Sequence, residues 1–201
     1  MGQVSHRYDG DMPRWEPDAR ARLAVAALQL FSDQGYDETT VAQIADRAGL
    51  TKSTFFRHFS DKREVLAAGQ ETLSQLLVEG ITTAPVDATP LTALAAGLER
   101  AASAMTPFNR DLAPRIKAVI AASTELQERD ALKHVGLAVA MADALRGRGV
   151  ADPIAVTAAE LGVLALKDAF AQWTADDNEH TLGDLTRASL DRLRSVLAQL
   201  E

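Results

Sequence analysis

Two short amphipathic segments constrain the fold of this chain more than any other feature. Residues 40–48 and 51–59 each repeat apolar side chains at helical spacing for about two turns, with Gly49 between them. Thr40 can open a capping box, and Thr51 is a favoured N-cap residue for the second segment. Helices this short do not persist alone in water, so we expect both to pack on a third helix.

The preceding segment supplies a suitable third helix. Apolar side chains recur at helical spacing from Asp18 onward, and the pattern stops at Gly35, a typical C-terminal cap. Gly49 can adopt the positive φ that a tight helix-turn-helix joint requires. We therefore predict a three-helix unit over 18–62. Its core should combine residues of the long helix and of the two short ones: Leu23, Ala27, Leu30, Phe31, Ile44, Ala48, Leu50, Phe55 and Phe59.

The rest of the chain predicts further helices and no strands. Ala and Leu, which both favour helices, fill 62 of the 201 positions. Helical periodicity covers the segments 61–77, 91–105, 109–123, 125–147, 153–175 and 181–199. We predict an all-α protein of about nine helices. Its expected parts are a flexible N-terminal arm over 1–17, a helix-turn-helix domain over 18–62 and a larger helical domain over 63–201.

Composition and motifs exclude several classes of protein. The chain has no cysteine, so it can hold no disulfide, thiolate metal site or thiol nucleophile. It has no Gly-rich phosphate loop, no Gly-x-Ser-x-Gly elbow and no His-Glu-x-x-His pair. No apolar run is long enough to cross a bilayer, and the first residues lack the apolar core of a signal peptide. We expect a cytoplasmic protein without catalytic residues, metal, cofactor or membrane partner.

The charge distribution indicates a nucleic-acid partner although the formal net charge is −7. Residues 71–201 hold 12 basic and 18 acidic side chains, whereas residues 47–63 hold five basic side chains and one acid. A short helix with a basic outer face fits the major groove of DNA. The alternative is an ordinary surface hairpin with solvated charges. We predict that DNA is contacted by residues on the second short helix and beside it: Arg47, Thr51, Lys52, Ser53, Thr54, Arg57 and His58.

The segment from Leu28 to Leu66 resembles the DNA-binding domain of the tetracycline-repressor (TetR) family. The resemblance rests on residues that share the family's spacing: Phe31, Gly35, Tyr36, Thr39, Thr40, Val41, Ile44, Ala45, Ala48, Gly49, Leu50, Thr54, Phe59, Lys62 and Leu66. It implies a three-helix head, a linking helix from Asp61, and an all-α C-terminal domain that dimerises and binds a small effector.

The resemblance also implies roles for single residues. Thr40 would contact a phosphate, Lys62 would touch the DNA backbone, and the helix from Lys52 to His58 would enter the groove. Phe56 stands where the family usually has a tyrosine whose hydroxyl reaches a phosphate. Phe56 cannot form that bond, and it can pack on sugars or on a thymine methyl instead.

The last two predicted helices indicate a homodimer. The final helix carries two apolar stripes, whereas a terminal helix that packs only on its own domain needs one. The helix over 153–175 is rich in small residues that allow close approach. Two helices from each copy would form a two-fold interface. The predicted contacts are Ala158, Gly162, Ala165, Leu182, Leu185, Ser189, Leu193 and Val196. The alternative is that both helices are central core.

The helices between predict a pocket for a small apolar or amphipathic effector. Methionine and aromatic side chains adapt to the shape of a ligand. The candidates are Leu98, Met105, Phe108, Ile116, Val119, Ile120, Leu137, Met141, Leu164, Phe170 and Trp173. Plain core packing is the alternative for each of them. Residues 115–130 and 168–173 resemble a TetR subgroup with acyl-CoA-like ligands, which implies an effector of that kind.

These features together predict a transcription regulator. It would be a ligand-responsive repressor that binds a pseudo-palindromic, double-stranded DNA operator as a homodimer. The alternative is a helical small-molecule-binding or interaction protein whose head has lost DNA binding. Salt-dependent affinity for DNA separates the two hypotheses.

Overall fold

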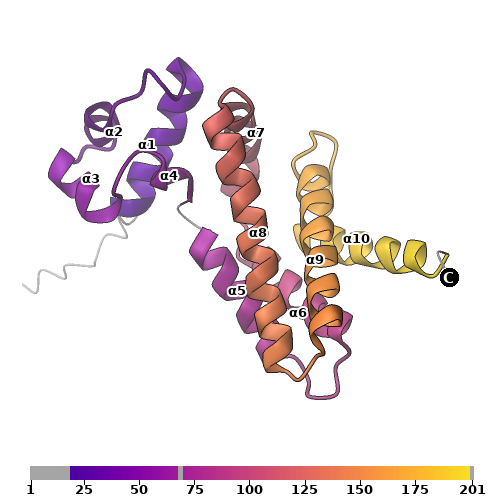
Figure 1. Ribbon diagram of the computed structural model, residues 1–201. Coiled ribbons are helices and arrows are strands. Elements are labelled where there is room, and N and C mark those ends of the chain that lie inside the picture. Colours follow the sequence, from indigo (N-terminus) through magenta and orange to yellow (C-terminus); the bar gives the residue numbers. More distant parts are fainter. Residues whose placement is uncertain (1–18, 68–69, 200–201) are drawn as a thin grey trace, which may run out of the picture.

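The computed structural model describes residues 19–67 and 70–199, and these residues form ten α-helices and no strand (Figure 1). The helices are α1 Ala19–Gln34, α2 Val41–Arg47, α3 Lys52–His58, α4 Glu64–Ala67, α5 Gln70–Thr83, α6 Pro90–Ser103, α7 Pro107–Ala121, α8 Thr124–Gly147, α9 Asp152–Trp173 and α10 Leu182–Leu197. The predicted all-α class is confirmed. The predicted arm over 1–17 lies outside the described residues. The helix expected from Asp61 is described as α4 and α5.

The caps of the two short helices are the ones that the sequence predicts. The side chain of Thr40 accepts a hydrogen bond from the backbone of Gln43, and the Gln43 side chain accepts one from the backbone of Thr40. Thr51 caps α3 by accepting from the backbone of Thr54. Gly49, between the helices, has a φ of 66°, a conformation that residues with a Cβ rarely adopt. Local chemistry therefore sets the turn between α2 and α3.

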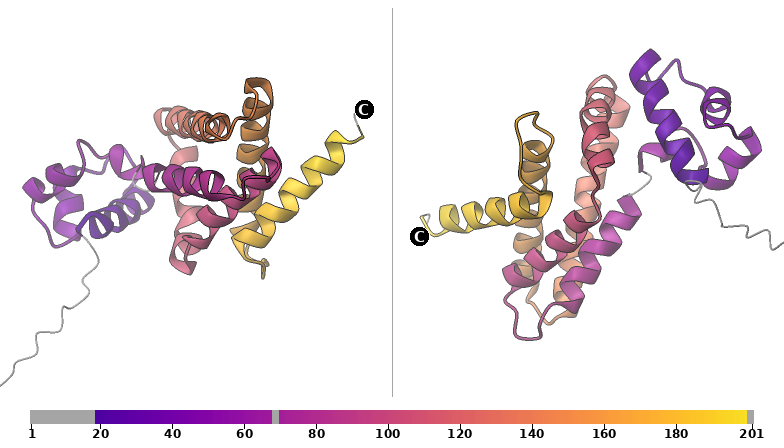
Figure 2. Two further views of the ribbon diagram at one scale, coloured as in Figure 1. Left: turned by 90° about the horizontal axis from the view of Figure 1, so that it is seen from below. Right: turned by 180° about the vertical axis from the view of Figure 1, so that it is seen from behind.

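A hydrophobic core joins α1, α2 and α3 into the predicted three-helix head. Its buried side chains come from all three helices and from residues beside them: Leu23, Ala26, Ala27, Leu28, Leu30, Phe31, Tyr36, Ile44, Ala45, Ala48, Phe55, Phe59 and Val65. Leu50 packs against this core from a half-buried position. Val119 of α7 and Leu126 of α8 belong to the same cluster, so the head rests on the larger part of the chain. Figures 1 and 2 show the head beside the ends of α7 and α8.

A second core lies between α5, α6, α8 and α9. Leu77, Leu94, Met141 and Leu145 are among its fully buried side chains. Gly80 of α5 and Gly97 of α6 lie where the two helices cross. They let the helix backbones touch, because a Cβ on Gly80 would lie 2.6 Å from the Ala96 carbonyl oxygen. We call α5–α10 the body.

The last helix is only half supported by the rest of the chain. The buried residues of α10 all lie between Leu182 and Leu190. From 191 to 199 every residue is exposed except the half-buried Leu193. In Figures 1 and 2, α10 lies across α9, and its C-terminal half projects away from the other helices. Within the described ranges, no helix is long and apolar enough to cross a membrane.

Candidate nucleic-acid interface

The outer face of α3 presents a mixed basic and aromatic surface. Lys52, Ser53 and Arg57 are exposed, and neither cationic side chain has an ion pair among the described residues. Phe55 is fully buried and sets the rotation of the helix. Phe56 is 55% exposed, with its ring edge-on to Phe55 at a centroid distance of 5.6 Å. A surface with an exposed phenylalanine between two cationic side chains suits a negatively charged partner that also has apolar groups.

Two predicted contact residues on α3 are less accessible. Thr54 is half-buried, and its hydroxyl lies 3.0 Å from the hydroxyl of its N-cap, Thr51. His58 is also half-buried, and its Nε2 is buried with no described residue in hydrogen-bonding distance. To reach a base edge with Nε2, His58 would have to turn outward from this position.

The residues predicted on α2 lie at its two ends. Thr40 is exposed at the N-terminal end, where it caps the helix. Arg47 is exposed in the last turn and lies 3.8 Å from Asp33 on α1. An exposed ion pair of that length contributes little to stability, so Arg47 can exchange this partner for another anion.

Lys62 has three partners inside the head. Its Nζ donates to the carbonyl oxygens of Tyr36, Asp37 and Thr39 at 2.7, 3.2 and 3.0 Å. The same atom lies 4.3 Å from the centre of the Tyr36 ring. The structure thus places this predicted DNA contact against the turn that precedes α2.

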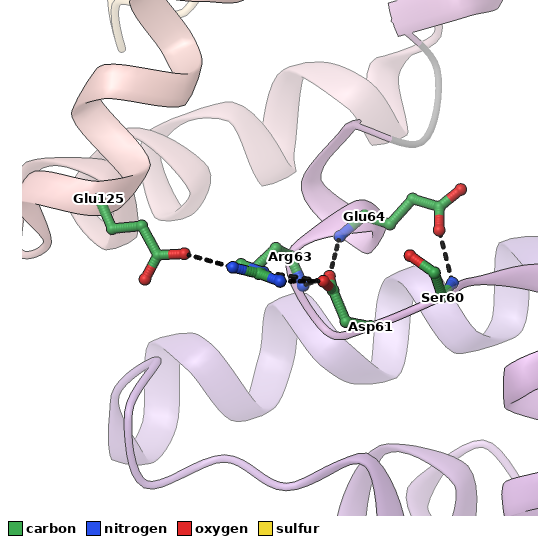
Figure 3. Close-up of polar contacts among 5 residues, drawn as sticks. All are labelled: Ser60, Asp61, Arg63, Glu64 and Glu125. Carbon is green, nitrogen blue, oxygen red and sulfur yellow. Dashed lines mark hydrogen bonds and ion pairs between the residues drawn. The ribbon is translucent and has the colours of Figure 1, made fainter.

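The start of α4 forms a polar junction between head and body (Figure 3). Asp61 Oδ1 accepts from the backbone N–H of Arg63 and of Glu64, at 2.8 and 3.0 Å. Arg63 donates to Asp61, and through Nη1 to Glu125 on α8 at 3.2 Å. The Arg63 guanidinium, together with the two backbone N–H groups, lowers the pKa of Asp61. The backbone N–H of Ser60 lowers the pKa of Glu64.

This arrangement divides the basic residues of the segment 47–63 into two groups. Lys62 and Arg63 are held by partners within the chain. Lys52 and Arg57 project from α3, and among the described residues Arg47 is held only by a long ion pair with Asp33. The surface that α3 offers to a partner is therefore more basic than acidic, and its cations are available.

The residues predicted for an effector pocket do not form one site. Leu98, Leu137 and Met141 are fully buried in the core of the body. Three others, Ile116, Val119 and Ile120, pack against the head core. Leu164 and Phe170 are exposed on α9. The side chain of Phe108 lies outside the described set. The sequence could not separate these groups, because each satisfies the same apolar helical periodicity.

Two of the predicted pocket residues, Met105 and Trp173, line a common cavity. This cavity has a volume of about 460 Å³, within the range of small-molecule sites. Its wall consists of Glu99, Ala102, Ser103, Met105, Pro107, Arg110, Trp173, Glu179, His180, Thr181, Leu182 and Gly183. Arg110 closes one side by donating to the carbonyl oxygens of Ala175 and Asn178, at 3.0 and 2.8 Å. Sequence reasoning missed Arg110 and Glu99, because the wall joins segments that are distant in the chain.

Most residues predicted for a dimer interface are buried within the single chain. Ala158 and Ala165 belong to the body core, and a Cβ on Gly162 would lie 2.8 Å from Leu94 of α6. The expectation that these small residues face a second copy is not met, because they make room for α6 of their own chain. Leu182, Leu185 and Ser189 are buried as well, whereas Leu193 is half-buried and Val196 is 53% exposed.

The head matches a described protein family. Residues 23–68 fit the family model for bacterial regulatory proteins of the tetR family. Over 75 residues the chain is 37% identical to the HTH-type transcriptional regulator TcmR of Streptomyces glaucescens. Over 76 residues it is 37% identical to the HTH-type transcriptional activator FasR of Mycolicibacterium smegmatis. These matches cover 37% and 38% of this chain, and about a third of the curated relatives, 33% and 34%.

Solved structures match the fold over most of the chain. One is SmeT, the repressor of the Stenotrophomonas maltophilia multidrug efflux pump SmeDEF, with 22% identity, a TM-score of 0.56 and coverage of 88% of this chain and 89% of SmeT. The SmeT–triclosan complex has 21% identity, a TM-score of 0.62 and coverage of 89% and 90%. A transcriptional regulator from Pseudomonas aeruginosa PAO1 has 21% identity, a TM-score of 0.60 and coverage of 90% and 93%. These similarities show the shared fold, a helix-turn-helix head on a helical body.

Proposed function

We propose that the chain is a transcriptional regulator of the TetR family, and that it is a ligand-responsive repressor that binds a pseudo-palindromic operator as a homodimer. The observation that carries the proposal is the outer face of α3. Lys52 and Arg57 project from a short helix that is capped at Thr51 and fixed by the buried Phe55. A helix of this kind fits the major groove, where cations bind phosphates and guanine edges.

Phe56 contributes an apolar contact in this proposal. Its exposed ring cannot donate a hydrogen bond to a phosphate, but it can pack on the C5 methyl group of thymine. The operator should then contain a thymine opposite Phe56. Replacing that thymine by uracil removes only the methyl group, and it should weaken the wild-type protein more than the Phe56→Ala variant.

A second copy of the chain is the partner that best supports α10. The C-terminal half of this helix is exposed and too short to be stable alone in water. Val196 and Leu197 on α10, together with Leu164 and Phe170 on α9, provide exposed apolar area for an isologous contact. A two-fold dimer would place two heads on half-sites about one helical turn of DNA apart, roughly 34 Å.

The cavity lined by Met105 and Trp173 is the proposed effector site. Its wall combines apolar side chains with the charged groups of Glu99 and Arg110, which suits an amphipathic ligand. SmeT, a protein of the same fold, has been solved with triclosan. An effector changes DNA binding only if it has different affinities for two conformations of the dimer that differ in the distance between the heads. Titration with triclosan or with palmitoyl-CoA, followed by the fluorescence of Trp173, tests this site, with Trp173→Phe as the control for signal from other residues.

The DNA-binding proposal is tested by selecting bound fragments from a genomic library and measuring affinity for the selected operator. Arg57→Ala and Lys52→Ala should each weaken binding by about tenfold or more, since each removes a charge-assisted contact. Arg100→Ala is the matched control, because Arg100 is exposed on α6 in the body. Equal affinity of all three variants would contradict the proposal. Absence of any salt-dependent DNA affinity would favour a helical small-molecule-binding protein instead.

The sign of regulation needs a separate measurement. Among the relatives, SmeT is a repressor whereas FasR is an activator. We propose repression, in which the dimer occupies the operator until the effector lowers its affinity. A reporter gene behind the selected operator should be silent with the wild-type chain and active with Arg57→Ala. The reverse pattern would identify an activator.

A further inference from the structure

We propose that Lys62 is a positioning residue for DNA binding, which clamps the turn before α2 and makes no phosphate contact of its own. The inference rests on the proposed function, since it concerns how the head is held for DNA. It differs from the role that the family resemblance implies for this lysine.

The first argument is the number of hydrogen bonds at Nζ. An ammonium group has three N–H donors and no acceptor. The Nζ of Lys62 donates to the carbonyl oxygens of Tyr36, Asp37 and Thr39 at 2.7, 3.2 and 3.0 Å. All three donors are therefore used within the head, and none is left for a phosphate oxygen.

The second argument is that the turn before α2 needs a hydrogen-bond donor for its carbonyl oxygens. The turn between α1 and α2 begins at Gly35, with a φ of 91°, and ends at the buried Thr39. The hydroxyl of Thr39 donates to the Gly35 carbonyl at 2.7 Å, which tightens the turn. Carbonyl oxygens that converge on one point repel one another unless a donor lies among them. Lys62 supplies that donor, and the face of the Tyr36 ring, 4.3 Å from Nζ, adds a cation–π contact.

The third argument is the place of Lys62 in the chain. It follows α3 and precedes α4, whereas the turn that it holds leads directly into Thr40, the N-cap of α2. The clamp therefore ties the C-terminal side of α3 to the N-terminal end of α2. These are the two elements that the proposed function places on DNA, so the clamp sets their relative position.

The neighbouring carboxylates do not account for the position of Lys62. Asp37 and Glu38 are exposed, and neither forms an ion pair with Lys62 within the described residues. Lys62 itself is half-buried. A lysine held only by the charge of the local surface would point to solvent. The position of the Lys62 Nζ is therefore explained by its hydrogen bonds to the three carbonyl oxygens.

The salt dependence of DNA binding distinguishes a clamp from a phosphate contact. Each phosphate contact adds about 0.9 to the slope of log affinity against log salt concentration. Lys62→Met keeps the length of the side chain and removes the ammonium group. We expect it to lower affinity about tenfold or more at every salt concentration, with the slope unchanged. Lys52→Met is the matched control on α3, and it should reduce the slope by about 0.9.

Lys62→Arg keeps the charge and changes only the geometry. A planar guanidinium cannot direct its N–H groups to three carbonyl oxygens that surround a single nitrogen. We expect this variant also to bind the operator about tenfold more weakly. A lysine that served as a phosphate contact would instead be replaced by arginine with little loss.

Amide hydrogen exchange in the free protein provides a readout that does not depend on DNA. The backbone N–H of Thr39, which donates to the Tyr36 carbonyl at 3.2 Å, should exchange faster in Lys62→Met and at the wild-type rate in Lys52→Met. Amides in the middle of α1 should stay protected in both variants, which shows that the head remains folded.

The outcomes separate the clamp from the proposed function. A slope reduced by about 0.9 in Lys62→Met, full binding by Lys62→Arg, or unchanged exchange at Thr39 would each overturn the clamp. A wild-type chain without DNA affinity would overturn the proposed function, and the exchange data would then still decide whether Lys62 holds the turn. Weaker binding at constant slope with faster exchange at Thr39 would support the clamp.

Discussion

At the scale of single residues, the hydroxyl of Tyr36 is an unusual feature of the head. It is buried, and no described residue lies within hydrogen-bonding distance of it. Burial raises the pKa of Tyr36 to about 12, and the negative charges of Glu125 and Asp61 act in the same direction. An unsatisfied buried hydroxyl costs roughly 1–3 kcal/mol.

We therefore expect Tyr36→Phe to raise the free energy of unfolding by about 1 kcal/mol at neutral pH, since it removes only the unpaired hydroxyl. Urea denaturation measures this change, and an unaltered m-value serves as the check that the transition is still the same one. A clear loss of stability would show that the hydroxyl has a partner in solution.

The same residue predicts a pH dependence. Its pKa in the folded chain, about 12, exceeds the ordinary tyrosine value of 10.0, so the folded state holds the proton more tightly. The wild-type chain should lose stability as pH rises from about 10 to about 12. Tyr36→Phe should lose less over the same window, because it has no phenol to ionise. If the free energy of unfolding fell equally in both proteins across this window, the raised pKa of Tyr36 would be contradicted.

At the scale of helices, the contact between α5 and α6 depends on two glycines. A Cβ on Gly80 would lie 2.6 Å from both the Ala96 oxygen and the Gly97 Cα, and one on Gly97 would lie 2.7 Å from the Leu77 oxygen. Backbone atoms cannot move aside as a flexible side chain can. The close approach of these two helices is therefore possible only with glycine at the crossing.

Gly80→Ala should lower the free energy of unfolding by about 2–3 kcal/mol, because the two helices would have to separate. Gly136→Ala is the matched control: this glycine is exposed within α8, and its nearest side-chain atom would be 3.7 Å from the new Cβ. Alanine is the better helix former, so the control should gain up to roughly 1 kcal/mol. Thermal or urea unfolding of the two variants measures both the expected loss and the expected gain of stability. A Gly80→Ala chain as stable as the control would show that the crossing can open without cost.

At the scale of the whole molecule, the head contacts the body through apolar side chains of α7 and α8 and through an ion pair. Leu126 at the start of α8 is 2% exposed and belongs to the head core. One residue before it, Glu125 forms the exposed ion pair with Arg63 shown in Figure 3. An exposed ion pair contributes little, so the apolar contact should dominate the coupling.

Leu126→Ala should therefore destabilise the head by about 2–5 kcal/mol, the range for a buried leucine. Leu132→Ala lies two turns further along the same helix and is 68% exposed, so it should have almost no effect. Hydrogen exchange in α1 reports the stability of the head in both variants. Equal protection of α1 would mean that the head folds without support from α8.

Assembly is the second property of the whole molecule that can be tested. Val196→Asp places a charge on the exposed half of α10 and should shift a dimer towards monomer in sedimentation experiments. Operator affinity should fall with it, since a monomer binds only one half-site. Ile154→Asp, equally exposed at the other end of the body on α9, is the control for the added charge. A dimer that survives Val196→Asp would rule out α10 as its interface.

Much of the head could be predicted because its signals are local. The capping pair at Thr40, the cap at Thr51 and the turn at Gly49 depend on residues within a few positions of each other. The burial of Phe55 and the exposure of Lys52 follow from one short periodic pattern. These local features by themselves specify the helix-turn-helix unit and the exposed face of α3.

Tertiary structure decided what helical periodicity leaves open. Apolar spacing places Ala165, Val119 and Met141 alike on apolar helix faces, but only the packing assigns them to the body core or the head core. The sequence likewise identifies Lys62 only as a basic residue after α3. Its three carbonyl partners lie 23 to 26 positions earlier in the chain. Spacing along a helix reports which side is buried, whereas the identity of the neighbour is decided only when distant segments pack together.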